Sequence, residues 1–204
     1  MNSRSLFILV ISLLFGLSSF KVKEVKKSVI GKSISSIALL NVDGSIYNID
    51  SIKGAKGFMV VFTCNHCPFA KLYPERLNAL HRKFETLGVP LIAINSMDSM
   101  VYDEETFSLM RSKSAESKFE FAYLQDGKQL VGKEFGAEHT PHAFVIWRVD
   151  NRWVIKYSGA IDNNGEHPAL ATPYLANVVS ELLENKAITL QETESFGCRI
   201  FYRK

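Results

Sequence analysis

The feature that most constrains the fold is a pair of cysteines placed between two segments of different pattern. Cys64 and Cys67 follow directly after residues 57–62, a short apolar run. That run is rich in β-branched and aromatic residues, which is typical of a buried strand. The apolar residues after the cysteines follow a helical spacing, and they are Phe69, Ala70, Leu72, Tyr73, Leu77, Leu80 and Phe84. The pattern predicts a strand, then the two thiols, then a helix that starts at the first thiol.

This arrangement predicts redox chemistry. A thiolate is the nucleophile in thiol-disulfide exchange, and the unpaired N–H groups and dipole of a helix start stabilise an anion. We therefore expect the pKa of Cys64 to be lowered, with Cys67 one turn further along and close enough to resolve a mixed disulfide. Structural zinc is disfavoured because four-ligand sites usually need a second ligand pair, and the one other cysteine is Cys198. Two inert buried thiols are disfavoured because Asn65 and His66 between them are polar.

A second motif lies further along the chain. Thr140-Pro141 precedes an apolar run at residues 143–146. The ordered set of strand, Cys64 and Cys67, helix, and Thr140-Pro141 resembles the thioredoxin superfamily over residues 33–184, in particular its redoxin (AhpC/TSA-like) thiol-disulfide oxidoreductase branch. The resemblance implies an α/β thioredoxin-like fold, with a central mixed sheet flanked by helices and an N-terminal β-hairpin extension.

The resemblance also implies a function. Cys64 and Cys67 would be the catalytic thiols, and His66 would tune their pKa as histidine does in protein disulfide isomerase. Thr140 and Pro141 would bind the substrate, with Pro141 in the cis form facing the thiols and the neighbouring backbone pairing with a partner strand. The expected partners are protein thiols and disulfides together with a thiol electron donor or acceptor. No cofactor and no resident metal are expected.

A thiol peroxidase of the peroxiredoxin type is the rival enzyme. Its pattern places threonine three residues and proline seven residues before the peroxidatic cysteine. Here those positions hold Val61 and Gly57 for Cys64, and Cys64 and Val60 for Cys67. This departure argues against an efficient peroxidase but leaves the alternative open.

A non-enzymatic copper- or metal-handling redoxin is the alternative from another class. His139 and His142 flank Pro141 and are candidates to face the thiols, and thiolate with imidazole suits copper. Copper-delivering relatives, however, usually place three residues between the cysteines, where this chain has two. Both non-preferred functions therefore remain to be tested.

The role of Cys198 is open from the sequence. It could be an inert thiol packed in a last strand, a resolving thiol, or a partner in intermolecular bonding. Its apolar neighbours Ile200, Phe201 and Tyr202 favour packing, as does the usual burial of free cysteine. We expect Cys198 to be dispensable for turnover.

The N-terminus predicts export. Residues 1–19 have a positive, an apolar and a small-residue region in order, which is the pattern of a signal peptide or an uncleaved anchor. Residues 20–32 are predicted to be a linker, and residues 33–204 the redoxin domain. The expected location of the protein is the periplasm or another extracytoplasmic compartment. Contact with a membrane is expected only if the leader stays uncleaved. Lys and Arg number 24 against 21 acids, an excess too small to suggest nucleic-acid binding.

The remaining elements follow from periodicity and turn residues. Two hairpins are predicted, at residues 37–49 around Asp43-Gly44 and at residues 144–158 around Asp150-Asn151. Further strands are expected at residues 89–95 and 121–124. Helices are expected at residues 104–114, in a short segment ending at Phe135, and at residues 173–183 with Thr172 as the N-cap.

Overall fold

The computed structural model describes residues 27–204, so the predicted leader (1–19) and most of the predicted linker (20–32) lie outside the described residues. The chain forms an eight-stranded sheet in the order β1-β9-β8-β4-β5-β6-β2-β3 and a two-stranded sheet of β7 and β10. The strands of the large sheet are β1 (Ser33–Ile34), β2 (Ala38–Asn41), β3 (Ile46–Asn48), β4 (Gly57–Phe62), β5 (Leu91–Asn95), β6 (Ala122–Gln125), β8 (His142–Val149) and β9 (Arg152–Gly159).

The sheet is mixed, as predicted. β4, β5 and β6 run parallel, whereas β8 pairs antiparallel with β4, and β9 antiparallel with β8. All six residues of β4 are buried, because this strand lies in the middle of the sheet and is covered on both faces. The cysteine loop therefore leaves from the carboxyl end of a strand that is buried along its whole length.

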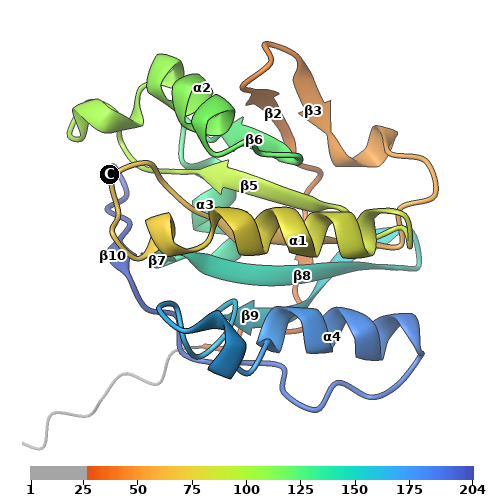
Figure 1. Ribbon diagram of the computed structural model, residues 1–204. Helices are drawn as coiled ribbons and strands as arrows, with labels where there is room; N and C mark the ends of the chain where they lie inside the picture. Colours follow the sequence, from red (N-terminus) through yellow and green to blue (C-terminus); the bar gives the residue numbers. More distant parts are fainter. Residues whose placement is uncertain (1–26) are drawn as a thin grey trace, which may run out of the picture.

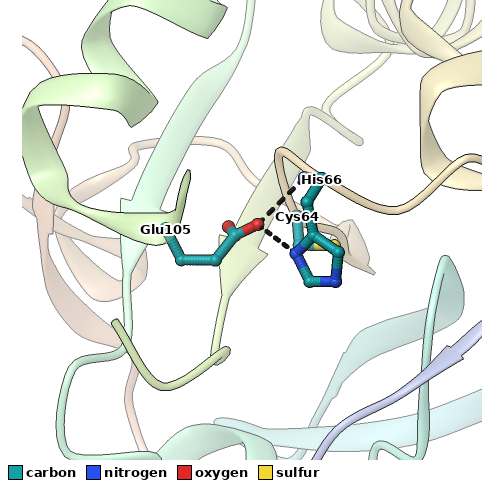
Figure 2. Close-up of side chains that lie close together, drawn as sticks. All are labelled: Cys64, His66 and Glu105. Carbon is teal, nitrogen blue, oxygen red and sulfur yellow. Dashed lines mark hydrogen bonds and ion pairs between the residues drawn. The ribbon is translucent and has the colours of Figure 1, made fainter. Parts of the chain in front are cut away.

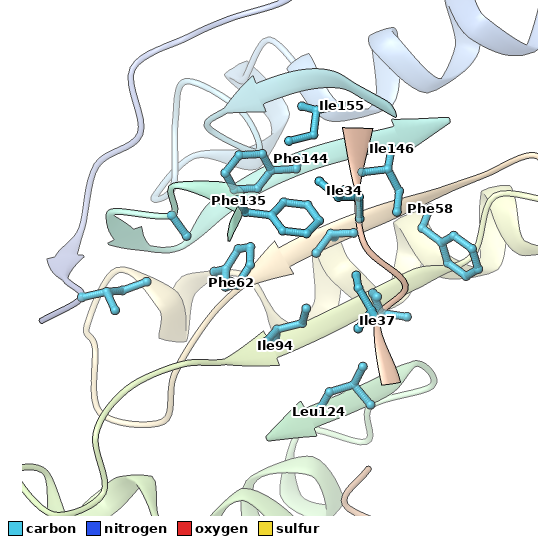
Figure 3. Close-up of a cluster of buried hydrophobic side chains, with 14 of the residues drawn as sticks. Ile34, Ile37, Phe58, Phe62, Ile94, Leu124, Phe135, Phe144, Ile146 and Ile155 are labelled. Carbon is cyan, nitrogen blue, oxygen red and sulfur yellow. The ribbon is translucent and has the colours of Figure 1, made fainter. Parts of the chain in front are cut away.

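Helices cover both faces of the sheet (Figure 1). The helices are α1 (Pro74–Glu85), α2 (Phe107–Glu116), α3 (Leu130–Phe135) and α4 (Tyr174–Leu183), with short 3-10 turns at Ile49–Ser51, Ala70–Leu72, Asp103–Glu105 and Pro168–Leu170. Residues of α1, α2 and α4 share one core with β4, β5 and β8. On the other face, the ring of Phe62 meets Phe135 of α3 and Phe144 of β8 edge-on, with centroids 5.4 and 5.6 Å apart (Figure 3).

The N-terminal hairpin and the β8–β9 hairpin are confirmed. β2 pairs with β3 across a turn that holds Gly44 at φ +94°. Asp150 and Asn151 both take positive φ, at 47° and 61°, as the two central residues of a tight hairpin require. Before β1, the segment around Lys32 already bonds to β9, since Ile155 donates its N–H to the Lys32 carbonyl at 3.0 Å.

The predicted helix start at Cys64 is wrong. Regular helix begins only at Pro74, after two turns and the 3-10 turn at Ala70–Leu72. Pro74 has no N–H to continue a helical ladder and its ring clashes with the preceding helical turn, so it can open a helix but not lie inside one. Phe69 and Leu72, which the helical spacing assigned to the core, are 46% and 42% exposed.

Two further helix starts differ from the prediction. α4 begins at Tyr174 with Pro173 in the N-cap position, and no side chain caps it, so the assignment of Thr172 as N-cap is wrong. The helix expected from residue 104 begins at Phe107, where the Thr106 side chain accepts the capping bond. Within residues 27–204, none of the helices has the length and apolar character needed to cross a membrane.

Candidate redox site

The two predicted thiols lie in the loop that leaves β4. Thr63 extends the pairing of β4 with β5 by donating its N–H to the Ile94 carbonyl at 2.9 Å, and the loop begins at the next residue. Cys64 and Cys67 are both free thiols, and they are 3% and 0% exposed. The end of a buried strand thus delivers both sulfur atoms into the interior.

Both sulfur atoms meet at Thr140. The Cys64 Sγ lies 3.1 Å from Thr140 Oγ1, and the Cys67 thiol donates to the Thr140 carbonyl oxygen at 2.9 Å. The Thr140-Pro141 peptide bond is cis, as the family resemblance implied. The structure therefore brings Cys64, Cys67 and Thr140 together, although Thr140 lies more than seventy positions from either cysteine.

A buried carboxylate that the sequence analysis missed completes the site. Glu105 is 1% exposed and accepts the backbone N–H of Asn65 at 3.0 Å and that of His66 at 2.9 Å (Figure 2). It also accepts from the Asn95 side chain at 2.6 Å and lies 2.6 Å from His66 Nδ1. These contacts occupy the N–H groups at the start of the loop with a carboxylate.

Nothing in the local sequence marked Glu105. It stands at the end of an acidic run, Asp103-Glu104-Glu105, which is usually exposed, and its partners come from two other segments. In the structure, the 3-10 turn Asp103–Glu105 places the buried Glu105 side chain against the cysteine loop. The neighbouring Glu104 contributes only its backbone carbonyl, which accepts from the Asn65 side chain at 2.7 Å.

The predicted lowering of the Cys64 pKa is wrong. The hydrogen bond between the two thiols, the burial of the sulfur atom and the negative charge of Glu105 all raise the pKa of Cys64. The hydrogen bond from Cys64 lowers the pKa of Cys67 to about 4, although the Thr140 carbonyl beside that sulfur atom favours its protonated form. The helix-start argument fails because the N–H groups that would stabilise a thiolate are bound to Glu105.

His66 lies between Glu105 and the surface. Its ring stacks on Tyr102 with centroids 4.7 Å apart, and its side chain is 20% exposed. Atoms of Cys64, His66 and Glu105 that can bind metal lie within 4.8 Å of one another. The carboxylate of this cluster already accepts several hydrogen bonds, so a metal ion would have to displace part of them.

The two histidines beside Pro141 have other partners. His139 Nδ1 lies 3.0 Å from the Ser195 hydroxyl, and His142 Nε2 lies 3.1 Å from the Ser158 hydroxyl. The Glu138 N–H also donates to His142 Nδ1 at 3.2 Å. Both imidazoles therefore have hydrogen-bond partners of their own, and neither belongs to the group of possible metal ligands that the described residues form around Cys64.

Cys198 reaches the site from the end of the chain. Strand β10 (Cys198–Arg199) pairs antiparallel with β7 (His139–Thr140), which sets Cys198 opposite Thr140. The half-buried Cys198 side chain packs against the core cluster that contains Cys64 and Cys67, and burial and the neighbouring Cys67 raise the pKa of Cys198 to about 12. The strand edge beside Pro141, which the family resemblance assigns to a partner chain, is thus paired with the chain's own last strand.

Known proteins with the same overall fold were found by comparison of structures. An uncharacterized conserved protein from Geobacillus kaustophilus is 29% identical, with a TM-score of 0.77 over 85% of this chain and 92% of the other. Peroxidoxin BcpB from Mycobacterium tuberculosis has a TM-score of 0.57 at 12% identity, over 78% of this chain and 98% of its own. A putative thiol:disulfide interchange protein DsbE from Chlorobium tepidum has a TM-score of 0.51 at 19% identity, over 69% and 88%.

The two more distant likenesses show that the fold is thioredoxin-like. Among curated proteins, no match to the sequence was found. The sequence matches the AhpC/TSA family over residues 30–162, which is more than half of the chain and contains both loop cysteines, Glu105 and Thr140. The chain therefore belongs to the AhpC/TSA family, within the redoxin branch of the thioredoxin superfamily.

Proposed function

We propose that the protein is an exported thiol-disulfide oxidoreductase that exchanges disulfides with protein partners through Cys64 and Cys67. The observation that carries the proposal is the meeting of two free thiols at Thr140, 3.1 and 2.9 Å from its hydroxyl and carbonyl oxygens. Two sulfur atoms held by one residue can form a disulfide with little rearrangement of the backbone. Export rests on the pattern of residues 1–19.

The proposed reaction has two exchange steps. The Cys64 thiolate attacks a partner disulfide, forms a mixed disulfide and releases one partner thiolate, which takes up a proton. Cys67 then attacks the Cys64 sulfur, so that a Cys64–Cys67 disulfide forms and the second partner thiol leaves. The partner gains two electrons and the protein loses two. The direction of net flow depends on the potentials of the partners, and no cofactor is required.

Roles for the surrounding residues follow from their contacts. In the proposal, Thr140 and Pro141 position the partner chain, and His66 tunes the thiols through Glu105. Both sulfur atoms are buried, so a partner can react only after part of the covering layer moves. The rings of Phe69 and Phe196, whose centroids are 6.0 Å apart, join the cysteine loop to the segment before β10 at the surface. We expect the partner to separate this pair.

Insulin reduction with dithiothreitol as electron donor tests the proposal. We expect the wild-type protein to accelerate insulin precipitation, and the Cys64→Ser/Cys67→Ser variant to run at the rate of dithiothreitol alone. Because Ser112 is exposed on α2, far from the thiols, Ser112→Ala serves as the control and should match the wild type. Equal rates for the wild type and the double variant would refute the proposal.

Peroxide reduction is the weaker candidate. The threonine and proline that the peroxidatic pattern places before its cysteine are replaced here by Val61 and Gly57. We expect slow peroxide consumption relative to disulfide exchange, and rapid, saturable, Cys64-dependent turnover of hydrogen peroxide would reverse the ranking.

Metal handling is a second candidate because Cys64, His66 and Glu105 form one cluster. Thiolate, imidazole and carboxylate together are donors that zinc accepts, and thiolate with imidazole also suits copper. Titration of the reduced protein with Zn²⁺ or Cu⁺, followed calorimetrically, would detect such a site. Stoichiometric binding that Glu105→Gln weakens and Glu104→Gln leaves intact would favour this function over redox exchange.

A further inference from the structure

Three thiols, rather than two, converge beside Thr140. Cys64 and Cys67 are buried in one core cluster against which Cys198 packs, and both Cys64 and Cys198 lie close enough to the Cys67 thiol to lower its pKa. Cys198 also lies opposite Thr140 in the β7–β10 pair, and its carbonyl oxygen is 3.5 Å from Thr140 Oγ1. Thr140 thus contacts each of the three cysteine residues. A thiol that served packing alone would need no such position.

The position of Cys198 is fixed by the structure of the C-terminal segment. Gly197 has φ +138°, and a Cβ there would lie 2.1 Å from the Thr140 carbonyl oxygen, so only glycine lets the two backbones approach this closely. Ile200 is buried and donates its N–H to the Glu138 carbonyl at 2.8 Å. The Tyr202 hydroxyl donates to the Ala137 carbonyl at 2.7 Å. The segment is therefore anchored on both sides of the cysteine.

We propose that Cys198 is a third redox thiol of this site, which exchanges disulfide with Cys67. The inference rests on the proposed function, because the Cys64–Cys67 disulfide is its substrate. The Cys198 thiolate attacks the Cys67 sulfur, the Cys67–Cys198 bond forms as the Cys64–Cys67 bond breaks, and Cys64 leaves as a thiolate that takes up the proton lost by Cys198. No external oxidant or reductant is needed for this step.

The step gives the oxidised protein a second form. In the first form the disulfide occupies Cys64, the residue that meets the partner in the proposed reaction. In the second form the disulfide lies between Cys67 and the chain's own last strand, and Cys64 is again a free thiol. Cys198 here takes the place that a partner cysteine would take, since β10 occupies the strand edge beside Pro141.

Disulfide mapping tests the inference. The Cys64→Ser variant should be oxidised with diamide at low protein concentration, alkylated, digested without reduction and analysed by mass spectrometry. We expect a linked peptide pair containing Cys67 and Cys198 and the loss of two thiols per chain. The matched control, Cys64→Ser/Cys198→Ser, keeps one thiol and should form no intrachain link. Two thiols that remain free, or that form only separate adducts, would overturn the inference.

The wild-type protein provides a second readout that does not depend on the folding of a variant. Equilibrated in a glutathione buffer that oxidises half of the chains, it should contain the Cys67–Cys198 pair alongside Cys64–Cys67, and absence of the former would also overturn the inference. The insulin assay is separate. Loss of insulin turnover with Cys67–Cys198 still formed would reject the proposed function alone, whereas normal turnover without that pair would reject this inference alone.

Discussion

The two segments that meet at Thr140 differ in how they are held. The cysteine loop leaves a central buried strand, and a buried carboxylate, Glu105, accepts the N–H groups of Asn65 and His66. The C-terminal segment forms a two-residue strand that has one neighbour, β7, and is held by a close approach at Gly197 and by a few bonds around it. The position of the cysteine loop thus depends on hydrogen bonds to a buried negative charge. The position of β10 depends instead on the close packing of two backbones, which is a steric fit.

The first prediction separates the two loop cysteines and has the largest effect. Cys64→Ser should abolish covalent capture of a partner, whereas Cys67→Ser should accumulate mixed disulfides, because attack proceeds while resolution fails. Non-reducing electrophoresis after incubation with a disulfide-containing protein measures both. Equal trapping by the two variants would contradict the order of attack.

The second prediction tests the steric fit of the last strand. Gly197→Ala places a Cβ against the Thr140 carbonyl in a backbone conformation that favours glycine, so it should lower the free energy of unfolding by about 1–3 kcal/mol. Gly127→Ala is the control, since a Cβ there meets nothing closer than 3.9 Å. Urea unfolding of both variants decides the matter. If the urea midpoint of Gly197→Ala is no lower than that of Gly127→Ala, the close approach of Gly197 to Thr140 does not contribute to stability.

The third prediction tests the electrostatics of the loop. Glu105→Gln removes a negative charge that helps to raise the pKa of Cys64, so that pKa should fall. The thiolate fraction at neutral pH should rise with it. Ultraviolet thiolate absorbance against pH, with Glu104→Gln as the matched control, measures the change. Identical titration curves for Glu105→Gln and Glu104→Gln would show that Glu105 does not affect the pKa of Cys64.

The smallest effect is expected at His66. His66→Phe keeps the backbone N–H that binds Glu105 and retains an aromatic ring for Tyr102, but it removes the ring nitrogen beside the carboxylate. The Glu105 charge is then less neutralised, so the pKa of Cys64 should rise and the pair should become more reducing, by ~30 mV or less for a shift of up to one unit. Glutathione equilibration measures the potential. A potential equal to that of the wild type would eliminate the tuning role.

Much of the fold could be predicted from the sequence because its signals are local. The buried run of β4 and the turns at Gly44 and at Asp150-Asn151 follow from short patterns, whereas the meeting of the loop cysteines with Thr140 was implied by the family resemblance. The start of α1 was mispredicted because helical spacing continued across residues 69–73, while Pro74 prevents a helix there.

The missed parts of the site depend on contacts between distant segments. Glu105 lies forty residues from Asn65, its hydrogen-bonding partner, within a run of acids that has the pattern of an exposed turn. Cys198 lies 58 positions from Thr140, and its apolar neighbours suggested packing. Ile200 does pack in the core, but Phe201 is exposed and the cysteine between Gly197 and Arg199 faces the other thiols. Only the tertiary structure places a third cysteine beside Thr140.

The most direct test of the central claim is the reduction potential of the wild-type protein in glutathione buffers, with the linked peptides mapped at each ratio. The account predicts a single two-electron transition in which a linked pair containing Cys64 and Cys67 appears as the free thiols disappear. Chains in which Cys64 and Cys67 stay free, or become separately glutathionylated without ever being linked, would contradict the claim that these two cysteines are a redox pair.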